Sequence, residues 1–310
     1  MKDINLKVDY RTNKRLALQK TNQVFGKVVT YSFLAIMAFI VIVPFYWMLN
    51  VSLQGSSEVL DSVSVSFFPK EFSPENYSNV FLYSSSSQAN MTFSRYLTNT
   101  VVVAIFSTAL GTLFSILVAF ALARLNFKGK DLIFTILLAT MMIPGEMMVI
   151  SNFVTISKFG WAGKDGIGSY LSMIVPFLVS IFHIYLLRQT FKQIPNELYY
   201  AAKVDGTSDM KYLWKVMVPM AKSSIITIVI LKLMGSWNAF VWPDIVAHEK
   251  FKLVTTWLRS SFVDQEAGSG RVLMNYQMAA TVIVTVPLLI VFILFRKYIM
   301  SGVSRSGVKG

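Results

Sequence analysis

Four polar side chains interrupt two long apolar runs, and they are the residues of this chain best placed to do chemistry. Glu146 stands in the run MMIPGEMM, whereas Lys232, Trp237 and Asn238 stand together in a run that ends near residue 242. Polar and ionisable groups are costly inside apolar segments and commonly serve a site there. An indole can cover the face of a sugar ring while a carboxylate and an amide bind its hydroxyls. These four residues are therefore candidates to line a substrate path.

Their depth along the two runs is similar. Counted as helix, Glu146 lies roughly 21 Å from the basic end of its run. Trp237 and Asn238 lie at about that depth in theirs, with Lys232 roughly 7 Å nearer the basic end. One cavity could therefore collect all four. Plainer roles stay open: the Trp-Asn pair can mark an interfacial belt before a kink, and Lys232 can pair with Glu146, reach the membrane surface or meet a partner subunit.

Several kinds of chemistry are excluded by residues that the chain lacks. It has no cysteine, so disulfides, thiolate metal sites and cysteine nucleophiles are absent. His183 and His248 are the only histidines, so we expect no histidine-built metal site. Since His183 lies one turn before Arg188, we expect an interfacial histidine rather than a proton relay.

A phosphate-binding glycine loop is also missing from the sequence. Gly163-Lys164 and Gly129-Lys130 come nearest to the G-x-x-x-x-G-K-[ST] pattern. Each lacks the upstream glycine, and each is followed by Asp rather than Ser or Thr. We therefore expect no nucleotide site and no enzymatic activity in this chain.

Composition predicts an all-α membrane protein with several spans. The 310 residues are 54% hydrophobic and only 15% charged, with a mean hydropathy of +0.55, whereas soluble domains are about 45–50% apolar. The first apolar block is too long for a signal-peptide core of about 7–15 residues. Blocks long enough for a hydrocarbon core of about 30 Å predict six transmembrane helices, at 28–49, 96–123, 132–156, 167–187, 223–242 and 274–295.

Basic residues are distributed unevenly around these spans. Of the 29 Lys and Arg residues, 20 lie in four segments. These are the 1–27 segment, the 124–131 turn, the 188–222 loop and the tail from residue 296, which includes residues 301–310. The positive-inside rule places these segments, and therefore both termini, in the cytoplasm. This topology also accounts for the net charge of +13 without a nucleic-acid partner. The opposite 54–94 loop, with its serine run, is expected to be flexible and solvated.

Residues 194–219 form the longest strongly polar interval in the second half of the chain. They predict two short helices joined by a glycine turn. Asn196 can N-cap the first helix. Gly206 predicts a left-handed stop after it, and Thr207 or Ser208 can cap the second helix.

The spacing within this segment resembles the cytoplasmic coupling loop of permease subunits in binding-protein-dependent ABC importers. Tyr200 departs from the pattern, which normally has an acid directly before the two alanines. An ordinary helix-turn-helix on the membrane surface is the alternative interpretation. The matching residues are Glu197, Ala201, Ala202, Asp205, Gly206, Val216, Val218 and Pro219.

Three other segments carry the same resemblance. The sequence FFPKEFSPENYSNVF at 67–81 resembles the segment before the second span of sugar-importer permeases. Residues 123–130 resemble the short turn after that span, and 302–310 resemble the Gly-Ala-Val-Lys-Gly ending of carbohydrate permeases. Over most of residues 28–310, the chain is thus similar to the shorter of the two permease subunits in importers of the maltose-transporter type.

This resemblance implies a six-span type I importer permease in a bacterial cell membrane, with the permease domain at 28–300. It implies import of an oligosaccharide that an extracellular solute-binding protein delivers. The implied partners are a second, different permease and two ATPase subunits, which would bind ATP and Mg²⁺ and dock on residues 194–219. No cofactor is expected in this chain itself.

Three alternatives remain at this stage. Within the same family, the solute could be a polyol or a glycerol-phosphate-type compound, although a phosphate would want more cations than Lys232. A membrane-embedded enzyme would need a catalytic cluster that two isolated histidines do not provide. A self-contained secondary transporter would need an internal repeat, and none is visible.

Overall fold

The computed structural model describes residues 2–61, 66–82, 91–260, 262 and 272–304. The regular elements of these residues are all helices, and Gln54 and Phe72 form an isolated β-bridge. Its elements in order are α1 (Lys2–Ser52), α2 (Ser56–Asp61), α3 (Asn76–Leu82), α4 (Phe93–Arg124), α5 (Lys130–Thr140), η1 (Gly145–Met148), α6 (Val149–Lys158), α7 (Ile167–Ile174), η2 (Val175–Phe177), α8 (Ile181–Lys192), α9 (Asn196–Val204), α10 (Asp209–Tyr212), η3 (Leu213–Met217), α11 (Val218–Met220), α12 (Lys222–Trp237), α13 (Val241–Val246), η4 (Glu249–Phe251), α14 (Val254–Ser260) and α15 (Met274–Ser304).

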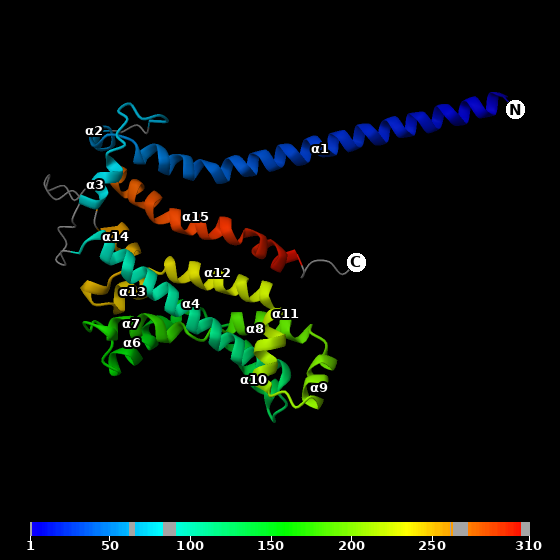
Figure 1. The fold of residues 1–310 in the computed structure, drawn as a ribbon. Coiled ribbons are helices and arrows are strands. Elements are labelled where there is room, and N and C mark those ends of the chain that lie inside the picture. The colour runs from blue at the N-terminus through cyan, green and yellow to red at the C-terminus, as the bar shows by residue number, and fades with distance from the viewer. Residues whose placement is uncertain (1, 62–65, 83–90, 261, 263–271, 305–310) are drawn as a thin grey trace.

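Helices α4, α8, α12 and α15 form the body of the molecule (Figure 1). α4 packs along both α8 and α12, and α15 packs along α12 and α1. α9 and α10 lie at the same end of this bundle as the N-terminal end of α1 and the C-terminal end of α15 (Figure 1). The short helices α6, α7, α13 and α14 lie at the opposite end (Figure 1).

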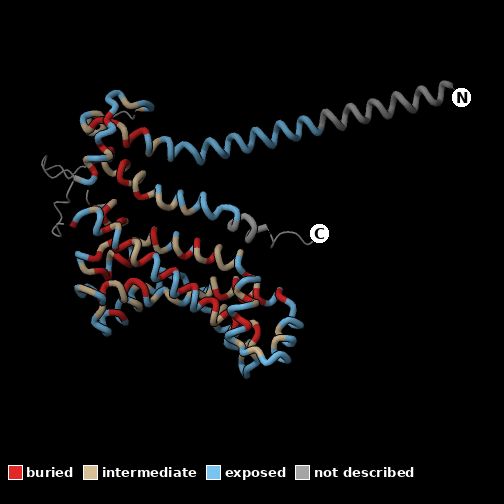
Figure 2. The backbone as a smooth tube through the Cα atoms, in the orientation of Figure 1, coloured by how far each residue is buried: buried red, intermediate tan, exposed pale blue. Residues whose placement is uncertain are grey.

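Small buried side chains let α4 approach its two neighbours. Ser107, Gly111, Ser115 and Ala119 recur every fourth residue and are all buried. Residues at this spacing form one ridge of a helix, and small ridge residues allow close backbone contact in membrane bundles. The buried positions gather where α4, α8 and α12 meet (Figure 2). α4 contains the span predicted at 96–123.

In the described part of the chain, three helices are each long and apolar enough to cross a membrane, namely Gln23–Ser52, Phe93–Arg124 and Met274–Lys297. Up to six spans result if each of three bent helix pairs counts as one, with bends of 93°, 50° and 83°. The first two bends lie within the spans predicted at 132–156 and 167–187, whereas the third lies at Ala221, just before the span predicted at 223–242. That last span is interrupted instead where α12 ends at Trp237.

The breaks fall where the sequence cannot continue a helix. α5 ends before Pro144, which has no N–H to donate and disfavours helix in the residue before it. A 3₁₀ turn that contains Pro176 separates α7 from α8. α12 ends at Trp237, and the side-chain amide of Asn238 then donates to the Met234 carbonyl oxygen at 2.9 Å. From sequence, the Pro144-Gly145 pair predicts a kink beside Glu146, and the 93° bend there confirms it.

Two features stand out at the N-terminal side. α1 runs without interruption from Lys2 to Ser52, so residues 2–27 and the span predicted at 28–49 belong to one helix. The 54–94 loop is partly ordered: Asn76 is buried, and its amide donates to the carbonyl oxygens of Ser52 and Gln54 at 3.0 and 2.8 Å. The serine run at 84–87 lies outside the described residues.

Candidate functional site

α9 and the turn after it form a helix end of the expected kind. Gly206 has a φ of 69°, which confirms the predicted left-handed stop. The Gly206 amide donates to Lys203 O at 3.1 Å, and the Thr207 amide donates to Ala202 O at 2.8 Å. These two bonds make a Schellman motif, which satisfies carbonyls that the helix end would leave unpaired.

Of the caps predicted for the two short helices, the structure contains one and lacks the other. Ser208 N-caps α10, because its hydroxyl accepts a 3.4 Å hydrogen bond from the Lys211 amide, as predicted. Asn196 does not cap α9. Pro195 occupies the cap position without a side-chain bond, and the Asn196 Oδ1 instead accepts from a guanidinium, that of Arg124.

The Arg124 guanidinium fastens the start of α9 to the bundle. It is 9% exposed at the last residue of α4, and its Nη2 donates to the carbonyl oxygens of Phe191, at 2.7 Å, and of Ile194. Both carbonyls belong to the C-terminal end of α8 or to the turn after it. One side chain therefore ties α4, α8 and α9 together.

Arg188 makes the converse contact from α8 to α4. Its Nε donates to Leu122 O at 3.1 Å, and its guanidinium lies 3.7 Å from the ring centre of Phe134 on α5. Arg188 and Arg124 thus each bind carbonyls of the other's helix. We did not predict either role, although an arginine in the last turn of a helix is a known partner for carbonyl groups there.

The second half of the segment is embedded in the bundle. Tyr212, Leu213 and Met217 are almost fully buried in one cluster with α4 and α8. Residues Leu213–Met217 form a π-helical turn just before Pro219, whose ring nitrogen cannot donate into the helix. The chain then bends by 83° into α12.

A polar cluster holds α9 against α10. Lys203 Nζ lies 2.7 Å from Asp209 Oδ1, and the Tyr199 hydroxyl donates to the same oxygen at 2.8 Å. The hydrogen bonds from Lys203 and Tyr199 hold the pKa of the Asp209 carboxyl below its usual value. Both helices are therefore braced at the turn as well as at their ends.

The outer face of this braced pair is exposed and partly apolar. Tyr200, Val204 and Met210 are 64%, 88% and 52% exposed. Large uncovered apolar side chains that gather on one face are typical of an interaction surface. Among the residues that matched the coupling-loop pattern, Ala202 is half-buried against the bundle, whereas Glu197, Ala201, Asp205, Gly206 and Pro219 are exposed.

The four predicted path residues are not gathered in one cavity. Glu146 is exposed at the break between α5 and α6, and its carboxylate forms no hydrogen bond or ion pair within the described part of the chain. Trp237 is buried against α4 and α15, whereas Asn238 is exposed at the end of α12. Lys232 points elsewhere, so pairing with Glu146, one of its three possible roles, is not formed among the described residues.

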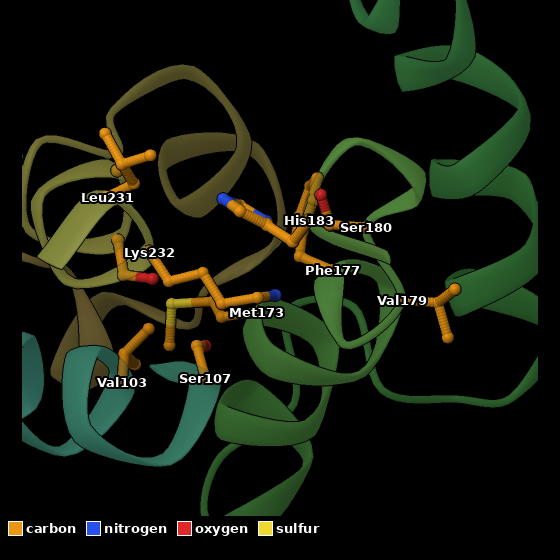
Figure 3. Close-up of a pocket in the computed structure, with 11 residues that line it drawn as sticks. Val103, Ser107, Met173, Phe177, Val179, Ser180, His183, Leu231 and Lys232 are labelled. Carbon is orange, nitrogen blue, oxygen red and sulfur yellow. The ribbon is translucent and has the colours of Figure 1, made fainter. Parts of the chain in front are cut away.

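Lys232 lies in a cavity of about 340 Å³ between α4, α7, α8 and α12 (Figure 3). His183 lines the same cavity, with a buried Nδ1 that has no hydrogen-bond partner among the described residues. His183 and Lys232 therefore face one cavity, and the interfacial position of His183 stays a prediction. The sequence missed this pair because a break in the 167–187 block brings His183 opposite α12.

A family model described as "Binding-protein-dependent transport system inner membrane component" matches residues 111–305, well over half of the chain. The chain belongs to this family. Its members are transporter components rather than catalytic enzymes. The resemblance to permease subunits of binding-protein-dependent importers is thereby confirmed.

Relatives of this permease-family chain include proteins named for sugar transport. The arabinooligosaccharides transport system permease protein AraQ of Bacillus subtilis is 31% identical over 282 residues, which are 90% of this chain and 94% of AraQ. The trehalose/maltose transport system permease protein MalG of Thermococcus litoralis is 30% identical over 89% of this chain and 94% of MalG. The diacetylchitobiose uptake system permease protein NgcG of Streptomyces coelicolor is 28% identical over 89% of this chain and 87% of NgcG.

A solved structure shows the same fold. It is a chain from the crystal structure of a bacterial ABC transporter involved in the import of the acidic polysaccharide alginate. The TM-score is 0.75 at 23% sequence identity, over 90% of this chain and 97% of that one. The fold is therefore that of a type I ABC importer permease.

Proposed function

We propose that this chain is the membrane-spanning permease subunit of a bacterial ABC importer that translocates an oligosaccharide. An extracellular solute-binding protein would deliver the sugar, and ATP hydrolysis in two separate ATPase subunits would drive transport. A second, homologous permease would complete the pathway. The names of the three relatives, which cover nearly the whole chain, support a carbohydrate as the solute.

The observation that carries this proposal is the braced, exposed surface of α9 and its turn. Arg124 fastens one end of α9, and the Lys203–Asp209 contact fastens the other. A rigid surface with uncovered Tyr200 and Val204 suits a groove in an ATPase subunit. When two ATPase subunits close on ATP and Mg²⁺, such a surface would move with them and displace α4 and α8.

The proposed topology follows from the same surface. If ATPase subunits dock on α9, that end of the bundle is cytoplasmic, and the N-terminal end of α1 and the C-terminal end of α15 lie there too (Figure 1), in agreement with the positive-inside rule. The bent pairs at 130–158 and 167–192, together with α12, then complete six spans with the three long helices. Glu146 and Asn238, exposed at two of the helix ends, remain candidate contacts for the solute.

Gly206→Val tests the coupling role in proteoliposomes that hold this chain, its partner permease, the ATPase and the binding protein. A side chain at positive φ is strained by about 1–2 kcal/mol, and nothing lies within 4 Å of the added Cβ. We expect binding-protein-stimulated ATP hydrolysis to fall while the complex stays assembled.

Gly160→Val is the matched control. Gly160 has a φ of 67° and equally open space, but it lies in the loop after α6 at the opposite end of the bundle. We expect near-normal coupling in that variant. Equal ATP hydrolysis and sugar uptake in wild type and Gly206→Val would refute the role proposed for α9 and its turn.

A further inference from the structure

Lys232 is a buried ammonium for which the described chain supplies no counter-ion. The residue is 8% exposed, and none of the hydrogen bonds or ion pairs of the described residues includes its Nζ. Counted along α12, it lies about 15 Å from Lys222, near the middle of a core about 30 Å thick. A charge at this depth is stable only with a partner.

The neighbouring α4 makes room for this ammonium. A Cβ built on Gly111 would overlap with Lys232 Nζ and would lie 3.1 Å from Leu178 O. Gly111 therefore keeps the end of the lysine side chain inside the bundle. This position rules out the two simplest roles, because Lys232 neither reaches the membrane surface nor pairs with Glu146.

The cavity around Lys232 has the composition of a ligand pocket. It combines apolar walls with a few polar groups, which are Lys232, His183 and the hydroxyls of Ser107, Ser180 and Ser236. None of the 11 lining residues is acidic. Figure 3 shows the Lys232 side chain extending beneath the His183 ring, with Phe177 beside both.

From these observations we infer that this cavity binds a carboxylate-bearing sugar unit of the transported saccharide, with the carboxylate on Lys232. The inference rests on the proposed function and narrows the substrate to an acidic oligosaccharide. Phe177 is 48% exposed and offers a ring face to the sugar, while His183 and the serine hydroxyls can bind its hydroxyl groups.

Size and charge favour this occupant over two others. The volume of about 340 Å³ falls within the range of small-molecule pockets, about 300–1,000 Å³. A single carboxylate side chain from a partner subunit would leave most of that space empty. One lysine also matches a singly charged carboxylate better than a doubly charged phosphate.

The test compares α-1,4-linked digalacturonate with its neutral counterpart, α-1,4-linked digalactose. Binding of each radiolabelled sugar is measured on the whole transporter in nanodiscs, for wild type and for Lys232→Met. We expect wild type to prefer digalacturonate, and Lys232→Met to bind it about 10- to 100-fold more weakly, as the loss of a charged hydrogen bond predicts. Lys232→Arg should retain part of the preference.

Two further variants separate the site from general effects. Lys222→Met removes the same charge from the exposed start of α12 and should bind both sugars as wild type does. Gly111→Ala should weaken digalacturonate binding because it displaces the ammonium.

Equal or absent binding of the two sugars by wild type, or unchanged binding by Lys232→Met, would overturn the inference. Dissociation of the two permeases in Lys232→Met without sugar would also overturn it, since the counter-ion would then be a partner's carboxylate. If digalactose is still taken up with ATP in any of these cases, the proposed function stands and only the acidic substrate is refuted. If neither digalactose nor digalacturonate is taken up, the result counts against the proposed function itself.

Discussion

Arg124→Ala should loosen the start of α9 from the bundle. The guanidinium donates to the buried carbonyls of Phe191 and Ile194 and to Asn196 Oδ1. A hydrogen bond to a charged group contributes about 1.5–3 kcal/mol, and a buried acceptor left unpaired costs about 1–3 kcal/mol. Because the three bonds share one side chain and are not additive, we expect a loss of about 3–5 kcal/mol in local stability.

Hydrogen–deuterium exchange of the reconstituted transporter measures this loss. A change of 3–5 kcal/mol corresponds to faster exchange by roughly two to four orders of magnitude at amides that open locally. We expect this acceleration in residues 196–204 and at the end of α8, together with lower binding-protein-stimulated ATP hydrolysis.

Arg95→Ala is the matched control, since Arg95 is an exposed arginine near the other end of α4. It should leave exchange in α9 unchanged. If Arg124→Ala also leaves exchange in residues 196–204 at the wild-type rate, the three-helix contact does not hold α9, and our account of a braced docking surface fails.

Two more predictions concern the same end of the bundle. Met217→Ala should lower the free energy of unfolding by about 2–5 kcal/mol, because removing a fully buried side chain leaves a cavity. Thermal unfolding in nanodiscs measures this loss. Met210 is exposed, so Met210→Ala should stay within about 0.5 kcal/mol of wild type. Lys203→Met should raise the pKa of Asp209, which a carboxylate-resolved infrared titration can follow. Because the pKa of Asp209 is lowered in the folded state, its contact with Lys203 stabilises the fold above the ordinary carboxyl pKa of 3.8. This stabilisation is lost as the pH falls through the lower pKa of the folded state. An unchanged Asp209 titration in Lys203→Met would show that the ion pair does not form.

The sequence predicted the helical class, the family and the turn at Gly206, because each depends on a local signal. Apolar block length identified the spans, and the need for glycine at positive φ fixed the stop after α9. Length and hydropathy identified the spans at 132–156 and 167–187 but do not register the bends within them. Pro144 and Pro176 were the available signals, and only the first was used.

The site was predicted less well than the fold, for a geometric reason. Depth along a helix can be counted from sequence, but the direction of each side chain cannot. Lys232 and Trp237 are five residues apart and therefore leave α12 in different directions, one toward His183 and the other toward α15. Asn196 was expected as an N-cap because of its residue type. The Arg124 contact that occupies its side-chain oxygen is long-range and has no local signature in the sequence.

The reciprocal arginines also constrain how α4 and α8 can move. Since Arg124 binds the end of α8 and Arg188 binds the end of α4, sliding either helix along the other would break contacts from both sides at once. The two helices must therefore rotate together as one rigid body. Ser107 and His183, which line the cavity around Lys232, lie on these two helices, at about 25 Å from Arg124 along α4 and about 8 Å from Arg188 along α8. A displacement of α9 would thus tilt α4 and α8 together relative to α12. This tilt would change the width of the cavity's opening rather than the residues that line it.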